Sequence, residues 1–297
     1  MREITMKIYN LGSLNIDYVY QVPHFVRPGE TLSSQNMKVF PGGKGLNQSV
    51  ALGRAGASVL HGGIINNNDT WLFSVLQNAG VDITRLKTAD SPSGHAIIQV
   101  DSNGQNCILL YAGANHEFTR NYVEAVLSDA ECGDIVLLQN EINCLDLIFE
   151  IAHAKKLHIA FNPSPFDKKL LNLPLSYVNW WICNEIEGSE LTGKSDPADI
   201  LSALSLMFPE SNILLTLGKE GCIFKNATLS LRQSAYNVKA IDTTAAGDTF
   251  TGYFLAMIAA GKPINEALQI ASYASSIAVS REGASSSIPY LNEVLKE

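Results

Sequence analysis

Toward its C-terminal end the chain reads Asp242-Thr243-Thr244-Ala245-Ala246-Gly247-Asp248-Thr249-Phe250, directly ahead of an apolar helical run at residues 251–260. The first amides of a helix have no acceptor inside the helix, and the helix dipole adds positive charge there. A phosphate is therefore expected against Ala245, Ala246 and Gly247, whose small side chains permit close approach. Because a carboxylate would repel that phosphate, Asp248 is expected to be a base that takes the proton of an attacking hydroxyl. The stretch predicts phosphoryl transfer.

A purely structural interpretation of the same stretch is also open. Asp is a common N-cap ahead of an apolar helix, and alanines at a helix start can simply allow tight packing. The segment alone does not separate the two alternatives. The rest of the chain has to supply further parts of a site.

The composition is that of a folded, acidic protein. For 297 residues the length prior is about two domains, although α/β folds of this size are often one core with an appendage. Hydrophobic residues make up 46% and charged residues 17%, so a fully folded chain is expected. The net charge of -8, without a Lys/Arg cluster, argues against a general nucleic-acid or anionic-membrane surface.

The cysteines and the N-terminal residues indicate a reducing compartment. Five widely spaced cysteines without a Cys-x-x-Cys pair are interpreted as small buried hydrophobes, not as zinc ligands. Residues 1–10 lead into a strand-like run, and no apolar stretch of about 18 residues occurs. We therefore expect neither signal peptide nor membrane span, and the predicted location is the cytoplasm.

From residue 120 onward, helical patterns alternate with short apolar strands, the rhythm of helices packed on a largely parallel sheet. The predicted fold class is therefore α/β. Core strands are expected at residues 7–11, 59–63, 135–138, 158–161, 180–183 and 213–217, and helices at 45–55, 263–280 and 289–296, the last two separated by a Gly/Ser-rich loop.

Four shorter strand patterns predict a small additional sheet. Two of them flank Asn103-Gly104, which is a strong hairpin signal. A lid that closes over a cleft excludes water, as phosphoryl transfer to a sugar requires. The short strands are expected at residues 18–22, 36–40, 95–100 and 106–111, forming a lid from segments of about 15–41 and 94–112 within a single domain of residues 1–297.

The loop Gly42-Gly43-Lys44-Gly45-Leu46-Asn47-Gln48 precedes an Ala/Leu-rich helix, and its glycines permit backbone conformations that other residues resist. A dinucleotide fingerprint would need glycine where Gln48 stands, so an NAD site is not favoured. Lys44 and Asn47 are instead suited to hydrogen-bond vicinal hydroxyls. A plain glycine turn is the alternative.

Residues 188–195, Gly-Ser-Glu-Leu-Thr-Gly-Lys-Ser, match the P-loop pattern letter for letter. A P-loop follows a strand and opens a helix, whereas residues 184–187 are already helix-like, and Glu190 would place a carboxylate in the phosphate cradle. We interpret the match as a helix end, with Ser195 capping the next helix and Pro197 in its first turn.

Polar residues at strand ends are further candidates. Asn184 and Glu187 share one face if their segment is helical. They are expected to be a Mg²⁺-binding or phosphate-orienting pair, or alternatively a solvated helix start with Glu in its first turn. Residues 216–221 follow an apolar strand as a nucleotide-side loop or a plain hairpin. Glu141 lies at the carboxyl end of a strand, where open α/β sheets bind ligands, or it is only a cap.

Together these segments resemble the ribokinase branch of the PfkB sugar-kinase family over essentially the whole chain. The resemblance implies a three-layer, doubly wound, mostly parallel α/β fold whose β-lid often pairs with a second lid in a homodimer. It also implies ATP-dependent phosphorylation of a sugar, with D-ribose and its 5-hydroxyl as the expected acceptor, and with Mg²⁺ and a monovalent cation, typically K⁺. The matching segments are residues 12–17, 42–48, 162–165, 184–187, 216–218 and 242–250.

The resemblance further implies a role for each motif residue. Asp248 is similar to the catalytic base, and Ala245, Ala246 and Gly247 are similar to the anion hole. Positions similar to sugar ligands are Asn15, Asp17, Gly42, Gly43, Lys44, Asn47 and Glu141, with Ile98 and Ile108 closing from the lid. Positions on the ATP side are Asn184, Thr216, Gly218, Gly221, Gly247 and Ser272, with Glu187 acting through Mg²⁺; those near the monovalent cation are Asp242, Thr244, Ala278, Arg281, Gly283 and Ser287.

One turn departs from the family pattern. Where the family usually has a Gly-Asp-Asp-type turn after its second core strand, this chain has Asn66-Asn67-Asn68-Asp69, and Trp71 replaces a following glycine. Asn tolerates a positive φ, which would allow the turn to survive. Other acceptors therefore stay open, namely deoxyribose, a nucleoside, fructose or a keto-deoxy sugar acid. A catalytically silent sugar-binding regulator is the alternative from another class.

Overall fold

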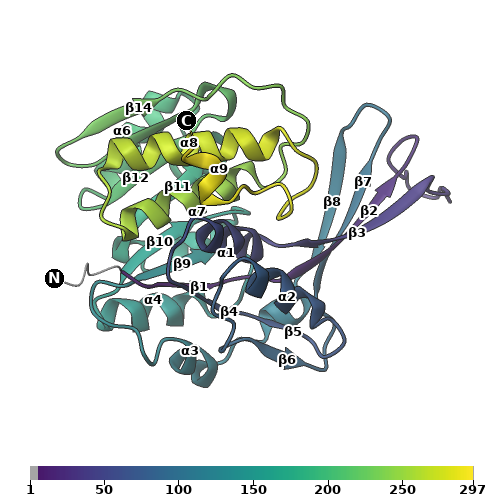
Figure 1. Cartoon of the computed structure of the whole chain (residues 1–297), viewed down its shortest axis with the longest axis horizontal. Coiled ribbons are helices and arrows are strands. Elements are labelled where there is room, and N and C mark those ends of the chain that lie inside the picture. Colours follow the sequence, from purple (N-terminus) through teal and green to yellow (C-terminus); the bar gives the residue numbers. More distant parts are fainter. Residues whose placement is uncertain (1–5, 297) are drawn as a thin grey trace.

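The computed structural model describes residues 6–296; the outermost residues of the predicted domain, 1–5 and 297, lie outside the described part. An eight-stranded sheet runs through its centre in the order β14-β13-β12-β11-β10-β9-β1-β4 (Figure 1). The six strands from β4 to β12 are parallel, and the last two are antiparallel. The strands are β1 Ile8–Leu11, β4 Val59–Gly62, β9 Ile135–Gln139, β10 His158–Asn162, β11 Val178–Asn184, β12 Asn212–Thr216, β13 Cys222–Lys225 and β14 Ser230–Gln233.

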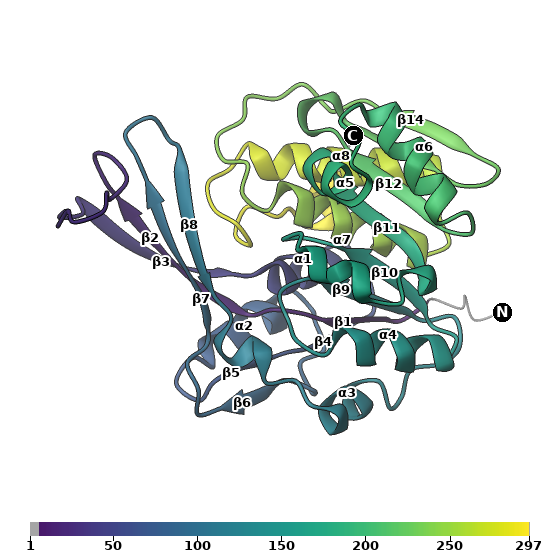
Figure 2. The same ribbon diagram turned by 180° about the vertical axis from the view of Figure 1, so that it is seen from behind.

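Helices cover both faces of this sheet, which confirms the predicted three-layer α/β architecture. Successive strand residues point to opposite faces, so Ile8 packs into one core and Tyr9 into the other. Parallel strands buried on both faces carry near-continuous apolar runs, as β9 does. One layer holds α1 Lys44–Arg54, α2 Trp71–Asn78, α7 Ala246–Ala259, α8 Ile264–Val279 and α9 Leu291–Val294, and the other holds α3 Arg120–Val126, α4 Leu145–Ala154, α5 Glu185–Thr192 and α6 Pro197–Met207 (Figure 2).

A separate four-stranded sheet projects from the α/β body (Figure 1). Its order is β3-β2-β7-β8, with a parallel pair at the centre and antiparallel pairs on both sides. Its strands coincide with the segments predicted to form a small sheet. They are β2 Asn15–Gln21, β3 Asn36–Gly42, β7 Gly94–Val100 and β8 Asn106–Tyr111, and a shorter pair, β5 Ile64–Asn66 and β6 Lys87–Ala89, lies beside the core.

The strand order reverses at β1. The chain passes from β1 to β4 on one side and later returns to β9 on the other side of β1. In open α/β sheets ligands bind beyond the carboxyl ends of the strands at such a switch point. Residues 12–15 leave β1 there and Glu141 leaves β9 there, so the fold itself marks the region of the predicted sugar ligands.

Local structure corrects two helix predictions. The helix that carries the apolar run of residues 251–260 begins at Ala246, as the expected helix-start amides at residues 245–247 implied, so Asp248 lies inside its first turn. The helix after the P-loop-like match is capped by Asp196, not Ser195, because the Asp196 carboxylate accepts the Ala198 and Asp199 amides; Pro197 is in the first turn as predicted. The last helix covers only Leu291–Val294.

The asparagine turn forms without the positive φ that the sequence suggested. None of its residues is among the non-glycine residues with positive φ in the described chain. Instead, the side-chain Nδ2 of Asn66 donates to the Asp90 and Ser91 carbonyls at 3.0 and 2.9 Å, and its side-chain oxygen accepts the backbone amide of Asn68. Side-chain hydrogen bonds to the backbone thus replace the conformational freedom of glycine.

Among the described residues, none of the helices combines the length and the apolar composition that a membrane span needs.

Candidate active site

The first turn of α7 has the features of an anion site. Its N-cap residue, Ala245, adopts a left-handed conformation with φ 58°. The Ala246 amide is partly used, because it donates to the Thr243 carbonyl at 3.3 Å. A Cβ added to Gly247 would meet nothing within 4 Å, so this glycine faces open space. Of the predicted anion-hole residues, Gly247 keeps an amide without an acceptor one turn earlier within the helix, and the Asp248 amide, which was not predicted, is in the same position.

Asp248 is not the helix N-cap, so the structural alternative for this residue is wrong. Its carboxylate is buried and points to α1, where Asn47 Nδ2 donates to Oδ2 at 3.1 Å and Gln48 Nε2 donates to Oδ1 at 2.9 Å. The two helices approach closely because Gly252 lies where a Cβ would come within 2.4 Å of the Ala51 Cβ. Helix packing therefore fixes the carboxylate that faces the anion site.

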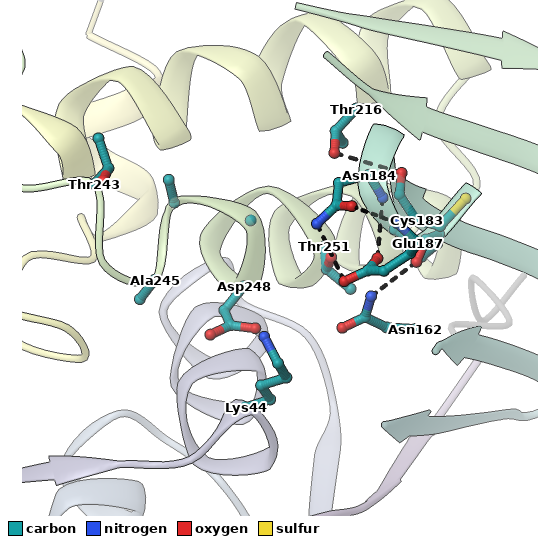
Figure 3. Close-up of a pocket in the computed structure, with 13 residues that line it drawn as sticks. Lys44, Asn162, Cys183, Asn184, Glu187, Thr216, Thr243, Ala245, Asp248 and Thr251 are labelled. Carbon is teal, nitrogen blue, oxygen red and sulfur yellow. Dashed lines mark hydrogen bonds between the residues drawn. The ribbon is translucent and has the colours of Figure 1, made fainter. Parts of the chain in front are cut away.

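Lys44 lies among carboxylates. Figure 3 shows its side chain extending from α1 toward Asp248, with Glu187 on the facing wall. Burial alone would lower the pKa of the Lys44 ammonium, but the charges of Asp248, Glu141 and Glu187 outweigh burial and raise this pKa. Lys44 is therefore a cation held at the centre of the site, suited to an anionic ligand or to a negatively charged transition state.

The predicted sugar ligands at the base of the small sheet come together. Strand pairing sets Asn15 opposite Gly42. A Cβ on Gly42 would lie 2.1 Å from Asp17 Oδ2, so glycine leaves the space that this carboxylate fills. Burial, followed by the charges of Glu141 and Asp248, raises the pKa of Asp17 to about 7. Ile98 and Ile108 pair directly in the sheet and share the face that carries Asp17.

Glu141 holds the glycine loop from below. Its Oε2 accepts the Lys44 amide at 2.9 Å and also the Ser13 hydroxyl, and that hydroxyl in turn accepts the Gly45 amide at 3.1 Å. The start of α1 is thus satisfied by side chains from two other segments, in place of an N-cap side chain of its own. Glu141 is therefore a structural anchor of the loop as well as a candidate sugar ligand.

Two adjoining cavities lie above α7. One, of about 230 Å³, is lined by Lys44, Asn184, Glu187 and Asp248 among others. The second, of about 520 Å³, is lined by the predicted ATP-side residues Thr216, Gly218, Gly221, Gly247 and Ser272. Both cavities share Thr216, Thr243, Ala246 and Gly247, so the first turn of α7 lies at their junction. Of the predicted sugar residues only Lys44 lines one of the two cavities described; the others, Asn15, Asp17, Gly42, Gly43, Asn47, Ile98, Ile108 and Glu141, line neither.

The Asn184–Glu187 pair forms a capping box. Asn184 Oδ1 accepts the Glu187 amide at 2.9 Å, and the Glu187 carboxylate accepts the Asn184 amide at 3.0 Å and its side-chain amide at 3.1 Å. Glu187 is only 6% exposed, so it is not the solvated helix start offered as the alternative. Residues 216–221 connect antiparallel strands, as the hairpin interpretation predicted, and several of them line the larger cavity; their role toward a nucleotide stays a prediction.

Three of the residues predicted near a monovalent cation, Asp242, Thr244 and Gly283, are joined by hydrogen bonds. Asp242 accepts the Thr244 amide at 2.9 Å and the Gly283 amide at 3.0 Å, which joins the two segments. These bonds, acting against burial, hold the pKa of Asp242 below its ordinary value. Arg281 does not point its charge there, because its guanidinium bonds to Glu293 at 2.6 Å.

Sequence reasoning missed several residues of this region. Asn115 donates to Asn15 Oδ1 at 2.7 Å and accepts the Leu14 amide, so it orients a candidate sugar ligand. Residues 235–240, with Tyr236 among them, form a wall of the larger cavity without regular secondary structure. Neither carries a motif. Three other unassigned residues of this region, Gln48, Ser13 and Asn162, do lie within segments that the sequence analysis had identified as motifs.

Comparisons with known proteins agree with this geometry. A family model described as pfkB family carbohydrate kinase matches residues 6–291. Ribokinase of Haemophilus influenzae is 34% identical over 298 residues, covering 96% of each chain. The crystal structure of Cryptococcus neoformans ribokinase in complex with ADP has a TM-score of 0.84 at 32% identity and covers 97% of this chain and 98% of that one. Arabidopsis thaliana ribokinase complexed with ribose and ATP has a TM-score of 0.86 at 26% identity, covering 98% of both.

The match by a family model over nearly the whole chain, the identity to a full-length relative and the shared fold all point in one direction. Among the functional alternatives they favour a sugar kinase. The geometry agrees, because a sugar kinase needs a buried carboxylate beside a site for phosphate. This chain belongs to the pfkB family of carbohydrate kinases.

Proposed function

We propose that this enzyme phosphorylates the 5-hydroxyl of D-ribose with ATP. The observation that carries the proposal is the position of Asp248, whose buried carboxylate lies in the first turn of α7 and lines the smaller of the two adjoining cavities. Relatives named ribokinase, one of them crystallised with ribose and ATP, support ribose as the acceptor. The grouping of Asn15, Asp17 and Gly42 at the base of the small sheet supports a polyhydroxylated ligand there.

The roles of the side chains follow from their chemistry. Asp248 would accept the proton of the sugar hydroxyl as it attacks. The amides of Gly247 and Asp248, with the Lys44 ammonium, would stabilise negative charge on the group in transfer. Asn47 Oδ1 is buried and has no partner among the described residues. It is therefore free to accept a hydrogen bond from a second hydroxyl, which supports its assignment as a sugar ligand.

The larger cavity fits a nucleotide. Gly218 and Gly247 both face open space, which lets a ligand approach the backbone, and Ser272 lines the same cavity. We propose Thr216, Gly218, Gly221 and Ser272 as the ATP side. Bound ATP would supply the phosphoryl group together with Mg²⁺. Because the described residues contain no cluster of three or more His, Cys, Asp or Glu able to hold a metal, Glu187 would assist a metal held mainly by phosphates.

A monovalent cation, the homodimer and the location are further parts of this proposal. Asp242 with the loop at residues 278–287 would hold K⁺ beside the anion site, a position that suits oxygen ligands. The five free thiols support a reducing, cytoplasmic location. A homodimer would form through the small sheet, whose edge strand β8 exposes a run of apolar residues, Ile108, Leu109, Leu110 and Tyr111.

The test of the proposal is ADP release from Mg-ATP with a panel of sugars and nucleosides, each with and without K⁺. We expect the fastest turnover with ribose, and a higher rate in K⁺ than in its absence. Turnover with another acceptor would keep the mechanism and move the specificity. Sugar binding without any turnover would favour the silent regulator and contradict the proposal.

Ribose affinity is expected to depend on pH through Asp17. With a pKa of about 7, this carboxyl is largely protonated at pH 6 and ionised at pH 8. Only the ionised form accepts hydrogen bonds from two hydroxyls with both oxygens. The KM for ribose should therefore rise about tenfold between pH 8 and pH 6. Steady-state kinetics at fixed, saturating Mg-ATP measure this.

The matched control is Asp17→Asn, which should show a high KM that does not change with pH. Because the folded protein keeps a proton on Asp17 that the unfolded chain releases above about pH 4, folding stability should fall as pH rises from about 4 to 7. Asp17→Asn should remove this fall. A KM for wild type that is flat over the same range would rule out Asp17 as the ionised sugar ligand.

A further inference from the structure

Gln48 is a buried residue for which the function proposed above has no use. It follows Asn47 on α1, is 0% exposed, and donates through Nε2 to Asp248 Oδ1 at 2.9 Å and to Asn162 Oδ1 at 3.2 Å. Its own oxygen accepts Gln139 Nε2 at 2.7 Å. The amide nitrogen and the oxygen of this side chain are thus both hydrogen-bonded. A buried polar network of this kind is stable only when its members find partners, and it then fixes one arrangement of the side chains.

The direction of these hydrogen bonds is fixed at both ends by backbone carbonyls. At one end, Asn162 Nδ2 donates to the Ile182 carbonyl at 2.9 Å, which turns the Asn162 oxygen toward Gln48. At the other end, Asn10 Nδ2 donates to the Gly45 carbonyl at 2.8 Å, which turns the Asn10 oxygen toward Gln139. Because a carbonyl cannot donate, none of the amides between them can flip without placing oxygen against oxygen.

We propose that Gln48 is a positioning residue for the reaction, which presents a permanently oriented N–H donor to Asp248 and holds this carboxylate in place, aimed at the sugar hydroxyl. The inference rests on the proposed function, since it gives Asp248 the role of base. Gln48 itself touches neither cavity among those described. It acts through Asp248, and its orientation is set by Gln139 and Asn162.

Charged groups from four other positions face the same carboxylate. Lys44 belongs to α1, Asp17 to β2, Glu187 to α5, and Glu141 follows β9. Three of these groups are carboxylates, which repel the Asp248 carboxylate, whereas the Lys44 ammonium attracts it. A neutral donor such as Gln48 binds the carboxylate without adding a charge that would compete for the phosphate. This explains why an amide, not a second lysine, suits the position.

The test is Gln48→Met, which keeps the length of the side chain and removes the donor. With the acceptor that the wild type phosphorylates fastest, kcat should fall about 10- to 100-fold, while both KM values stay within about threefold. Loss of a donor favours the protonated form of a carboxylate, so the acid limb of the kcat profile should move up by roughly one pH unit. If Gln48 served packing alone, its substitution would neither shift the acid limb of the kcat profile nor lower kcat while leaving the KM values unchanged.

The matched control is Ser49→Ala, the next residue on α1. Ser49 is equally buried and bonds to Asn10 and His61 in the same polar network, but not to Asp248. This variant should lower thermal stability and leave kcat and its acid limb unchanged. If Gln48→Met fails to fold, Gln139→Met releases the Gln48 amide from its anchor and should move kcat and the limb in the same directions by a smaller amount.

The outcomes separate this inference from the proposed function. No turnover by the wild type with any acceptor would overturn the proposed function and the role of Gln48 together. Normal wild-type turnover, with kcat and acid limb unchanged in Gln48→Met, or in Gln139→Met where only that variant folds, would overturn the role of Gln48 alone. The same acid-limb shift in Ser49→Ala would assign the effect to the fold and also contradict the proposal.

Discussion

Asp248→Asn is expected to lose about three orders of magnitude in kcat while the KM for ribose changes little. General base catalysis by a positioned side chain contributes about 10² to 10⁴ in rate, and an amide cannot accept the proton. The substitution keeps the size of the side chain and its place in the first turn of α7. Steady-state ADP release, with ribose affinity measured independently by calorimetry, tests the expectation.

The matched control is Asp196→Asn, another Asp in a helix-start segment. Asp196 caps α6 through the Ala198 and Asp199 amides and lines neither described cavity. Since Asn and Asp are about equally good N-caps, this variant should retain both turnover and stability. A turnover number in Asp248→Asn that equals that of the wild type would remove Asp248 from its proposed role.

Gly42→Ala is expected to reduce kcat/KM for ribose about 10- to 100-fold, mostly through KM. The added Cβ would lie 2.1 Å from Asp17 Oδ2 and 2.2 Å from its Cγ, so the carboxylate has to leave its place. Hydrogen bonds to a charged group contribute about 1.5 to 3 kcal/mol, which corresponds to this range. Gly42→Ala displaces the Asp17 carboxylate but keeps its charge, so it tests the position of this candidate sugar ligand separately from its charge.

A double-mutant cycle with Asp17→Asn decides the cause. If Gly42→Ala acts by displacing the Asp17 carboxylate, the two substitutions together should cost little more than Asp17→Asn alone. Full additivity would mean that Gly42 serves a different contact. The thermal midpoint of each variant has to be recorded, because Gly42 also ends a strand of the small sheet.

Much of the fold was accessible from sequence because its signals are local. Buried apolar runs and the Asn103-Gly104 turn located the six parallel strands of the large sheet and the four strands of the small sheet to within a few residues, whereas the antiparallel strands β13 and β14 were not predicted. The errors fell at helix ends, where a single capping bond decides the boundary. Asp196 in place of Ser195, and Ala245 in a left-handed conformation ahead of α7, depend on which group reaches which amide.

The site was accessible in part, through ordered motifs. The glycine loop and the stretch around Asp248 predicted which residues meet an anion and a sugar, and the structure places both beside the same carboxylate. Their partners were not predictable. Asn115 meets Asn15 across 100 positions, and Asn162 meets Gln48 across 114. A single sequence holds no record of which distant side chains pair.

The sequence by itself determined the family resemblance, the α/β alternation and the small residues that a phosphate requires, because helix starts, strand periodicity and glycine conformation act over a few neighbouring positions. Only the tertiary structure decided that Asp248 is a buried partner of α1 and not a cap, that Asp17 carries a pKa of about 7, and that the Gln48 amide has one possible orientation. Burial, charge and hydrogen-bond direction at these residues depend on segments up to 201 positions apart in the sequence. These segments come together only when the chain has folded.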